Sequence, residues 1–262
     1  MVESKPQDAD QNQGLVNGQF KIIKQIGEGS FGKVYLAQDT LSGNKQCAIK
    51  TESLSCRFPQ LLSEMQCLKT LKGHGFPRLM CNKMMVDDKR MMMATELLGP
   101  TLEDLFNFCG RNFSIKTCLM IFYQILQRLE HIHSRNMIHR DIKPDNILSG
   151  IEEKSSIIHM IDFGLTRSIL NKKTGRHIDF RTGKNLVGTA RFVSINAHLG
   201  YELSRRDDLL TLGYVMVYFT LGQLPWQYVD TRRKSARFTE LGRMKQSYST
   251  AELCKDCPKQ YQ

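Results

Sequence analysis

The chain of 262 residues has no apolar run long enough to cross a membrane. Its longest apolar stretch, Leu209–Leu221, is interrupted by Thr211, Gly213 and Thr220, whereas a spanning helix needs about 20 mostly apolar residues. The opening residues are polar and carry charges of both signs, so they match neither a signal peptide nor a myristoylation site. We therefore expect no membrane span and interpret Leu209–Leu221 as a core helix.

A disulfide framework is also missing, although the chain has eight cysteines. They are scattered, and a domain of this length does not need disulfides for stability. The pair Cys254 and Cys257 has C-x-x-C spacing but no second pair and no histidine nearby, so it does not form a zinc-binding pattern. We expect reduced thiols in an intracellular protein of the cytoplasm, the nucleus or both.

The sequence has no RNA-binding signature and no zinc-finger spacing, although its formal net charge is +11. A basic protein favours anionic partners, such as nucleotide phosphates and acidic or phosphorylated proteins. We expect no nucleic-acid partner. The apolar share of 41% and the charged share of 24% are ordinary for a soluble globular protein with a buried core.

The periodicity changes along the chain, from strands to helices. Residues 1–18 are polar without periodicity and predict a flexible leader. The following part predicts one amphipathic helix and five strands, at 59–72 and at 20–26, 33–38, 46–51, 79–86 and 90–96. The last part predicts mainly helices, at 102–109, 114–135, 206–222 and 235–246, with a basic loop at 171–188. We expect an α+β protein with a small antiparallel β-sheet lobe containing one helix (19–98) and a larger, mainly helical lobe (99–262).

Two motifs in the second part indicate phosphoryl transfer. Residues 139–146 read H-R-D-I-K-P-D-N, and residues 162–164 read D-F-G. Transfer from ATP needs a carboxylate that accepts the proton of the attacking hydroxyl, and oxygen ligands that hold magnesium against the phosphates. Protein kinases use the aspartate of H-R-D for the first task and the asparagine and the D-F-G aspartate for the second. The corresponding residues are Asp141, Asn146 and Asp162, and Lys143 is placed to neutralise charge on the γ-phosphate.

A glycine-rich segment lies between the first two predicted strands. Gly27–Val34 matches G-x-G-x-x-G-x-V, and its place between strands favours a flap over phosphates and disfavours a dinucleotide fold. A tight hairpin is the alternative. Glycine lets backbone N–H groups approach phosphate oxygens closely. The nucleotide contacts expected here are Ile26, Gly27, Glu28, Gly29, Ser30, Gly32 and Val34.

Lys50 ends the segment Ala48-Ile49-Lys50 on the third predicted strand. A lysine there can contact the α and β phosphates if a carboxylate from the next helix fixes its direction. Glu64, in the middle of that helix, is the expected partner. Glu52 is a rival on the same strand, but it could not couple the ion pair to the position of the helix. The alternative for Lys50 is an ordinary solvent-exposed strand lysine.

Other motif residues have structural interpretations. Asp208 is expected to be a buried anchor that accepts hydrogen bonds from the H-R-D loop. His139 and Phe163 are expected to pack inward. Arg140 could pair with an anion in the activation segment or form a structural salt bridge, and both remain open.

The end of the activation segment resembles one family. Most protein kinases have A-P-E there, whereas this chain has Ser194-Ile195-Asn196, followed by L-P-W-Q at 224–227. Residues 96–109 read E-L-L-G-P-T-L-E-D-L-F-N-F-C. From about Phe20 to Pro258 the chain resembles the casein kinase 1 family, which is marked by S-I-N. The resemblance implies a serine/threonine kinase that uses ATP and Mg²⁺ and prefers acidic or already phosphorylated substrates.

The same resemblance implies two further sets of residues. The adenine would be held by the backbone of 96–98, with Thr95 gating the pocket behind it, and the contacts are Ala48, Thr95, Glu96, Leu98 and Leu148. The substrate's acidic or phosphorylated residue would be bound by clustered cations, since guanidinium and ammonium groups bind such anions. These cations are Arg181, Lys184, Arg191, Lys234 and Arg237.

Two departures from the family pattern lead to an alternative function. Tyr228 stands where the family usually has a small residue, so we expect one side of the anion site to be partly blocked. Relatives continue past Gln262 through further helices, so we expect exposed apolar surface near Leu209–Leu221, with reduced stability or reliance on a partner. A non-catalytic, kinase-like scaffold is the alternative. The intact set of Lys50, Glu64, Asp141, Lys143, Asn146 and Asp162 argues against it.

Overall fold

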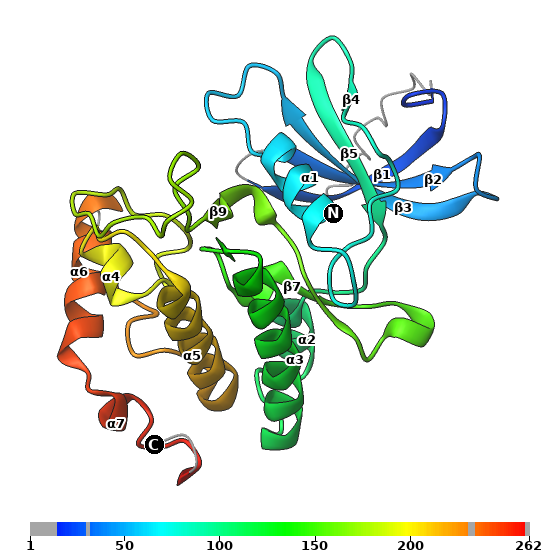
Figure 1. Ribbon diagram of the computed structural model, residues 1–262. Helices are drawn as coiled ribbons and strands as arrows, with labels where there is room; N and C mark the ends of the chain where they lie inside the picture. The colour runs from blue at the N-terminus through cyan, green and yellow to red at the C-terminus, as the bar shows by residue number, and fades with distance from the viewer. Residues whose placement is uncertain (1–14, 30–31, 230–233, 260–262) are drawn as a thin grey trace, which may run out of the picture. The chain divides into compact units, whose positions relative to one another are not determined.

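The computed structural model describes residues 15–29, 32–229 and 234–259, with only the backbone described for 234–237 (Figure 1). The chain divides into two compact units. The first contains the residues up to Met65 together with Arg78–Leu97, and the second contains Gln66–Pro77 together with the chain from Leu98.

An antiparallel sheet forms the framework of the first unit. Its strand order is β1-β2-β3-β5-β4, with bounds Phe20–Gly29, Gly32–Asp39, Lys45–Ser53, Arg90–Glu96 and Met85–Val86. Side chains that alternate along the strands point to one face, because successive residues of a strand face opposite sides. The core on that face contains Phe20, Ala37, Cys47, Ile49, Met85, Met92 and Ala94.

The prediction of a long strand over 79–86 was wrong. Only Met85–Val86 forms β4, while Leu79 makes an isolated bridge with Thr95. Between them the chain is held at single points: Met80 N donates to Ala94 O, and Ala94 N donates to Cys81 Sγ. The apolar residues of this segment run along the edge of the sheet without continuous backbone pairing. The sequence pattern does not show that the pairing is interrupted.

The helix α1 (Leu61–Thr70) begins two residues later than predicted. Its start is fixed by Glu52, whose carboxylate accepts the N–H groups of Gln60 and Leu61 at 2.9–3.1 Å. A carboxylate at a helix N-terminus satisfies unpaired N–H groups and complements the helix dipole. The strand residue Glu52 therefore anchors the helix.

The second unit is mainly helical, as predicted. Its helices are α2 (Leu102–Phe108), α3 (Ile115–Ser134), α4 (Ile195–His198), α5 (Arg205–Leu221), α6 (Lys234–Ser247) and α7 (Thr250–Leu253). The four predicted helices correspond to α2, α3, α5 and α6 with ends shifted by at most one residue. Two short strand pairs complete the unit: β6 (Met137–Ile138) with β9 (Arg167–Ser168), and β7 (Ile147–Ser149) with β8 (Ile158–Met160).

An aromatic cluster joins α2, α3 and α5, and α3 and α5 lie side by side (Figure 1). The ring centre of Phe106 lies 5.0–5.3 Å from those of Phe113, Tyr218 and Phe219. Ring pairs at such spacings add stability beyond the area that they bury. This aromatic core supports the loops that carry the site residues.

Apolar side chains remain exposed on the same two helices. Leu209 and Leu210 of α5 are 46% and 45% exposed, and α3 exposes Leu119, Met120 and Tyr123. The expected exposed surface near Leu209–Leu221 is therefore present. No helix among the described residues is long and apolar enough to cross a membrane.

Candidate active site

Three predicted site residues meet in the loop that follows β6. Asp141 Oδ2 accepts a hydrogen bond from Asn146 Nδ2 at 3.0 Å and lies 3.1 Å from Lys143 Nζ. Asn146 Nδ2 also donates to Asp141 O, at 2.9 Å. The buried carboxylate of Asp141 is thus held on one side by an amide and an ammonium group.

Thr189 holds the other side of that carboxylate. Its N–H and its hydroxyl both donate to Asp141 Oδ1, at 2.9 and 2.8 Å, and Lys143 Nζ donates to its Oγ1 at 3.2 Å. The sequence interpretation missed Thr189, because a single threonine in an aperiodic loop has no local pattern that links it to Asp141. The nearest signal was its position shortly before S-I-N.

Asp208 of α5 fixes the backbone of the loop as predicted. Its Oδ2 accepts from His139 N at 2.9 Å, its Oδ1 accepts from Arg140 N at 3.0 Å, and His133 Nε2 lies 2.9 Å from Oδ2. Arg140 has a φ of 71°, a conformation that costs about 1–3 kcal/mol in a non-glycine residue. The buried carboxylate of Asp208 stabilises this strained turn next to Asp141.

Neither interpretation of Arg140 matches its observed bond. Its Nε donates to the backbone carbonyl of Leu165 at 2.6 Å. Burial, and secondarily the charge of Arg167, lowers the pKa of Arg140 to about 10. Arg140 thus joins the H-R-D loop to the residue that follows D-F-G.

The D-F-G segment follows β8. Asp162 has φ 63° and ψ 66°, a left-handed conformation that aspartate tolerates better than most residues. Phe163 is fully buried, with its ring centre 5.1 Å from that of His139 and 6.0 Å from that of Phe76. The predicted inward packing of His139 and Phe163 is confirmed.

The oxygen atoms of Asn146 and Asp162 suit a magnesium ion. The nitrogen of the Asn146 amide is bound to Asp141, so the amide oxygen is the group available to a cation. Mg²⁺ prefers oxygen ligands and usually takes one or two from protein, with substrate phosphates and water supplying the others. Among the described residues no cluster of three or more His, Cys, Asp or Glu could hold a metal ion.

In the first unit, Lys50 pairs with Glu64. Lys50 Nζ lies 2.6 Å from Glu64 Oε2, and Glu64 is buried. Glu52 is not the partner, because its carboxylate is used at the start of α1. The structure therefore excludes both the rival partner and a simple exposed strand lysine.

The glycines at the end of β1 and the start of β2 differ in their surroundings. Among the described residues, a Cβ on Gly29 would meet nothing within 4 Å, and one on Gly27 would meet only Val34, at 3.6 Å. A Cβ on Gly32 would lie 1.7 Å from Thr51 O, so the sheet itself requires that glycine. Ser30 lies outside the described residues.

Other predicted nucleotide contacts lie along β1, β2, β3 and β5. Ala48 pairs with Thr95, and Val34 pairs with Lys50. Ile26 is exposed, and the carboxylate of Glu28 accepts from Gln25 Nε2 at 3.1 Å.

The predicted hinge contacts are divided between the units. Glu96 N donates to Arg78 O at 2.8 Å, and the Glu96 carboxylate accepts from Arg78 N at 2.9 Å. Leu98 and Leu148 belong to the second unit, where Leu148 forms a bridge with Thr101.

A family model described as the protein kinase domain matches residues 20–260. The chain belongs to the protein kinase family. This match, with the antiparallel sheet and the helical second part, confirms the predicted two-lobed α+β kinase fold.

The S-I-N segment of this kinase is tied to α5. Ser194 Oγ and Asn196 Nδ2 each donate to Asp207 Oδ1 at 2.8 Å, and Ser204 N donates to Asp207 Oδ2 at 2.8 Å. Asp207 is buried, and a buried carboxylate requires such donors. Two neutral side chains on one buried carboxylate therefore fix the end of the activation segment.

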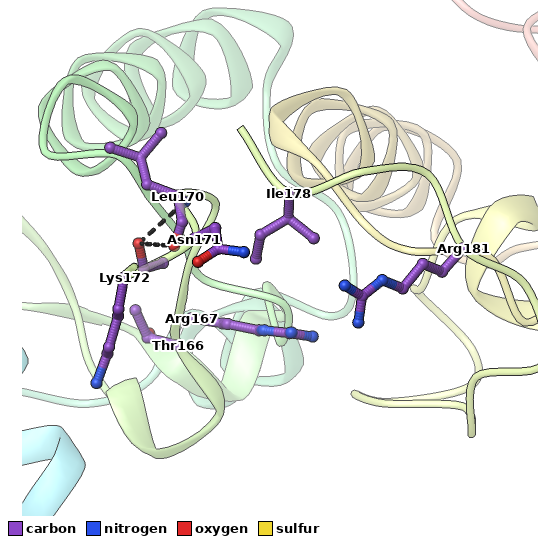
Figure 2. A pocket seen from close by; sticks show the side chains of 8 residues that line it. Thr166, Arg167, Leu170, Asn171, Lys172, Ile178 and Arg181 are labelled. Atoms are coloured by element: carbon purple, nitrogen blue, oxygen red, sulfur yellow. Dashed lines mark hydrogen bonds between the residues drawn. The ribbon is translucent and has the colours of Figure 1, made fainter. Parts of the chain in front are cut away.

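Of the five predicted anion-binding cations, the structure describes the side chains of Arg181, Lys184 and Arg191. Lys184 lies 3.2 Å from Glu202, which also binds Arg167 at 2.6 Å. Arg181 lines a pocket of about 450 Å³ together with Arg167 and Lys172. Figure 2 shows Arg167 and Arg181 extending toward one another, whereas Lys172 points away.

Arg191 is not among the residues that line this pocket. Its guanidinium group is 5.7 Å from the ring centre of Phe192. The side chains of Lys234 and Arg237 lie outside the described residues. Tyr228 is 75% exposed.

Proposed function

We propose that the chain is an active serine/threonine kinase of casein kinase 1 type, which transfers the γ-phosphate of ATP to acidic or phospho-primed proteins. The arrangement around Asp141 supports this proposal most strongly. Both carboxylate oxygens are engaged by donors from three residues, so the group is held in one orientation. A catalytic base must be fixed in this way to accept a proton from a substrate hydroxyl.

Each residue around Asp141 has a task in this proposal. Asp141 takes the proton of the substrate serine or threonine. Lys143, 3.1 Å from Asp141, neutralises negative charge that develops on the transferred phosphoryl group. Asn146 and Asp162 would hold Mg²⁺, which supplies charge neutralisation at the phosphates when bound.

Residues of the first unit would bind the nucleotide. The Lys50–Glu64 pair directs an ammonium group that can contact the α and β phosphates. Without a Cβ, Gly27 and Gly29 would let phosphate oxygens approach the backbone. The backbone of residues 96–98 would hold the adenine.

The preference for acidic or phosphorylated substrates rests on the cations of the second unit. Arg181 and Arg167 line the pocket of Figure 2, and Lys184 shares Glu202 with Arg167. One carboxylate balances only part of this positive charge, so an anion would be attracted. Arg191 would contribute, together with Lys234 and Arg237. The eight free cysteines support a place inside the cell, in the cytoplasm, the nucleus or both.

The test is phosphate incorporation from Mg·ATP into matched peptides. The peptides carry serine, threonine or tyrosine as acceptor and aspartate, phosphoserine or alanine N-terminal to it. We expect transfer to serine and threonine only, favoured by aspartate and phosphoserine. Transfer to tyrosine, or indifference to the neighbouring anion, would contradict the proposal. Stabilisation by Mg·ATP in a thermal-shift assay without any transfer would instead support the scaffold alternative.

A further inference from the structure

Lys245, near the end of α6, is buried without a carboxylate partner. It is 2% exposed, and among the described residues no Asp or Glu forms an ion pair with it. Burial lowers its pKa to about 7. A buried ammonium group is costly unless polar groups surround it, so the contacts of this side chain require an explanation.

Both hydrogen bonds of the Lys245 ammonium group go to one short segment of the chain. Its Nζ donates to Ala190 O at 2.9 Å and to Val193 O at 2.6 Å. The same nitrogen lies 5.1 Å from the ring centre of Tyr214 and 5.4 Å from that of Trp226. Carbonyl oxygens and ring faces both attract a cation, so this cage replaces the missing carboxylate.

The segment held by Lys245 is the one that carries Thr189. Thr189 O accepts from Phe192 N and Val193 N, which folds residues 189–193 into a tight turn. At the start of this turn, Thr189 is bound to Asp141 Oδ1. The turn therefore joins the carboxylate of Asp141 at one end to the ammonium group of Lys245 at the other.

Two further side chains hold the same turn. Trp226 Nε1 donates to Arg191 O at 2.8 Å, and His198 Nε2 lies 3.2 Å from Ala190 O. The helix α6 lies beside α4 (Figure 1), and a Cβ on Gly242 would come within 2.9 Å of His198 Cβ. This close approach lets Lys245 reach the carbonyl groups.

We infer that Lys245 is a positioning residue, which holds the turn at 189–193 so that Thr189 orients Asp141 for the substrate hydroxyl. An internal ammonium group thus orders the segment by binding its carbonyl oxygens. Lys245 does not contact the reacting atoms. As far as it concerns turnover, the inference rests on the proposed kinase activity.

The test compares Lys245→Met with Arg243→Met, an exposed cation on the same helix. Methionine keeps the length of lysine but cannot donate. In hydrogen exchange, we expect peptides covering 188–194 to exchange at least tenfold faster in Lys245→Met, with α5 peptides unchanged. We expect kcat/KM for a protein substrate to fall at least tenfold and the KM for ATP to change less than twofold. Arg243→Met should match the wild type in every measurement.

The outcomes separate this inference from the proposed function. If the wild type transfers no phosphate, the proposed function fails, while the exchange of 188–194 still decides the role of Lys245. Wild-type exchange and kinetics in Lys245→Met would overturn the inference. The inference would also be overturned if Lys245→Met lost ATP affinity as much as it lost turnover of the protein substrate, because a general role in folding would impair both. If Lys245→Met does not fold, Lys245→Gln is measured in the same way, and unfolding of both would assign Lys245 to the fold and overturn the inference.

Discussion

Asp208→Asn should destabilise the second unit by breaking the anchor under Arg140. The substitution keeps the shape of the side chain but puts an NH₂ group in place of one acceptor oxygen. If the amide oxygen replaces Oδ2 and serves His139 N and His133, then Arg140 N faces a donor. A buried donor without a partner costs about 1–3 kcal/mol, and the remaining bonds weaken by about 1 kcal/mol because the acceptor loses its charge. We expect unfolding to be easier by about 3 kcal/mol.

Urea denaturation followed by tryptophan fluorescence measures this loss in the correct unit. Trp226 is the single tryptophan of the chain, is buried, and belongs to the second unit. Asp256→Asn, at an exposed aspartate of the same unit, is the control. Phosphate transfer by Asp208→Asn should also fall more than tenfold, because the strained turn at Arg140 adjoins Asp141. A loss below 1 kcal/mol, equal to that of the control, would refute the anchor role of Asp208.

Three further variants give testable predictions. Glu64→Gln should raise the KM for ATP and lower kcat together by roughly tenfold or more, because Lys50 loses a charged partner at 2.6 Å. Arg191→Ala with Lys234→Ala should reduce phosphorylation of acidic peptides at least tenfold more than that of neutral ones, as initial rates would show. His198→Gln should remove part of the acid sensitivity, because burial and then the charge of Lys245 lower the pKa of His198 to about 4. Between pH 6.5 and 4 this histidine binds a proton in the unfolded chain but not in the folded chain. Lowering the pH therefore reduces the free energy of unfolding by about 2 kcal/mol. Urea denaturation at pH 7 and at pH 4.5 measures this change.

Each of these predictions has its own control or contradiction. Glu52→Gln should loosen the start of α1 and lower thermal stability, with less effect on ATP binding than Glu64→Gln. Equal losses on acidic and neutral peptides would refute the anion-binding role of Arg191 and Lys234. For the pH experiment, His74→Gln changes an exposed histidine and should leave the acid sensitivity intact. If His198→Gln loses stability with falling pH as much as the wild type does, the buried neutral state of His198 is not the cause of the acid sensitivity.

Local sequence patterns predicted the helices and the motif residues well. The packing of α3 and α5 in the aromatic core requires apolar residues at helical spacing. The predicted ends of both helices therefore lie within one residue of the observed ones. The pairing of Lys50 with Glu64 and the anchor at Asp208 could be predicted because each lies at a defined place in a motif or on a predicted element. The segment 79–86 was misread, since apolar residues at a sheet edge resemble a strand even where backbone pairing is intermittent.

The residues that sequence reasoning missed act over long separations. Thr189 meets Asp141 48 positions away, and Lys245 meets Ala190 55 positions away. Both lie where no periodicity marks them: one in an aperiodic loop, and the other as a charged residue on a polar helix, where exposure is the normal expectation. Their surroundings are set by tertiary packing, which the sequence pattern of either residue does not contain.

The most direct test of the account is single-turnover phosphate transfer by the wild type, Asp141→Asn and Asp145→Asn. Asp145 is exposed and lies in the same loop, so Asp145→Asn changes a nearby charge without touching the carboxylate bound by Asn146, Lys143 and Thr189. We predict that Asp141→Asn slows transfer by about 10²–10⁴-fold, as loss of a general base does, with Mg·ATP still bound. Asp145→Asn should transfer at nearly the wild-type rate. Transfer by Asp141→Asn at the wild-type rate would contradict the central claim that this carboxylate performs the chemistry.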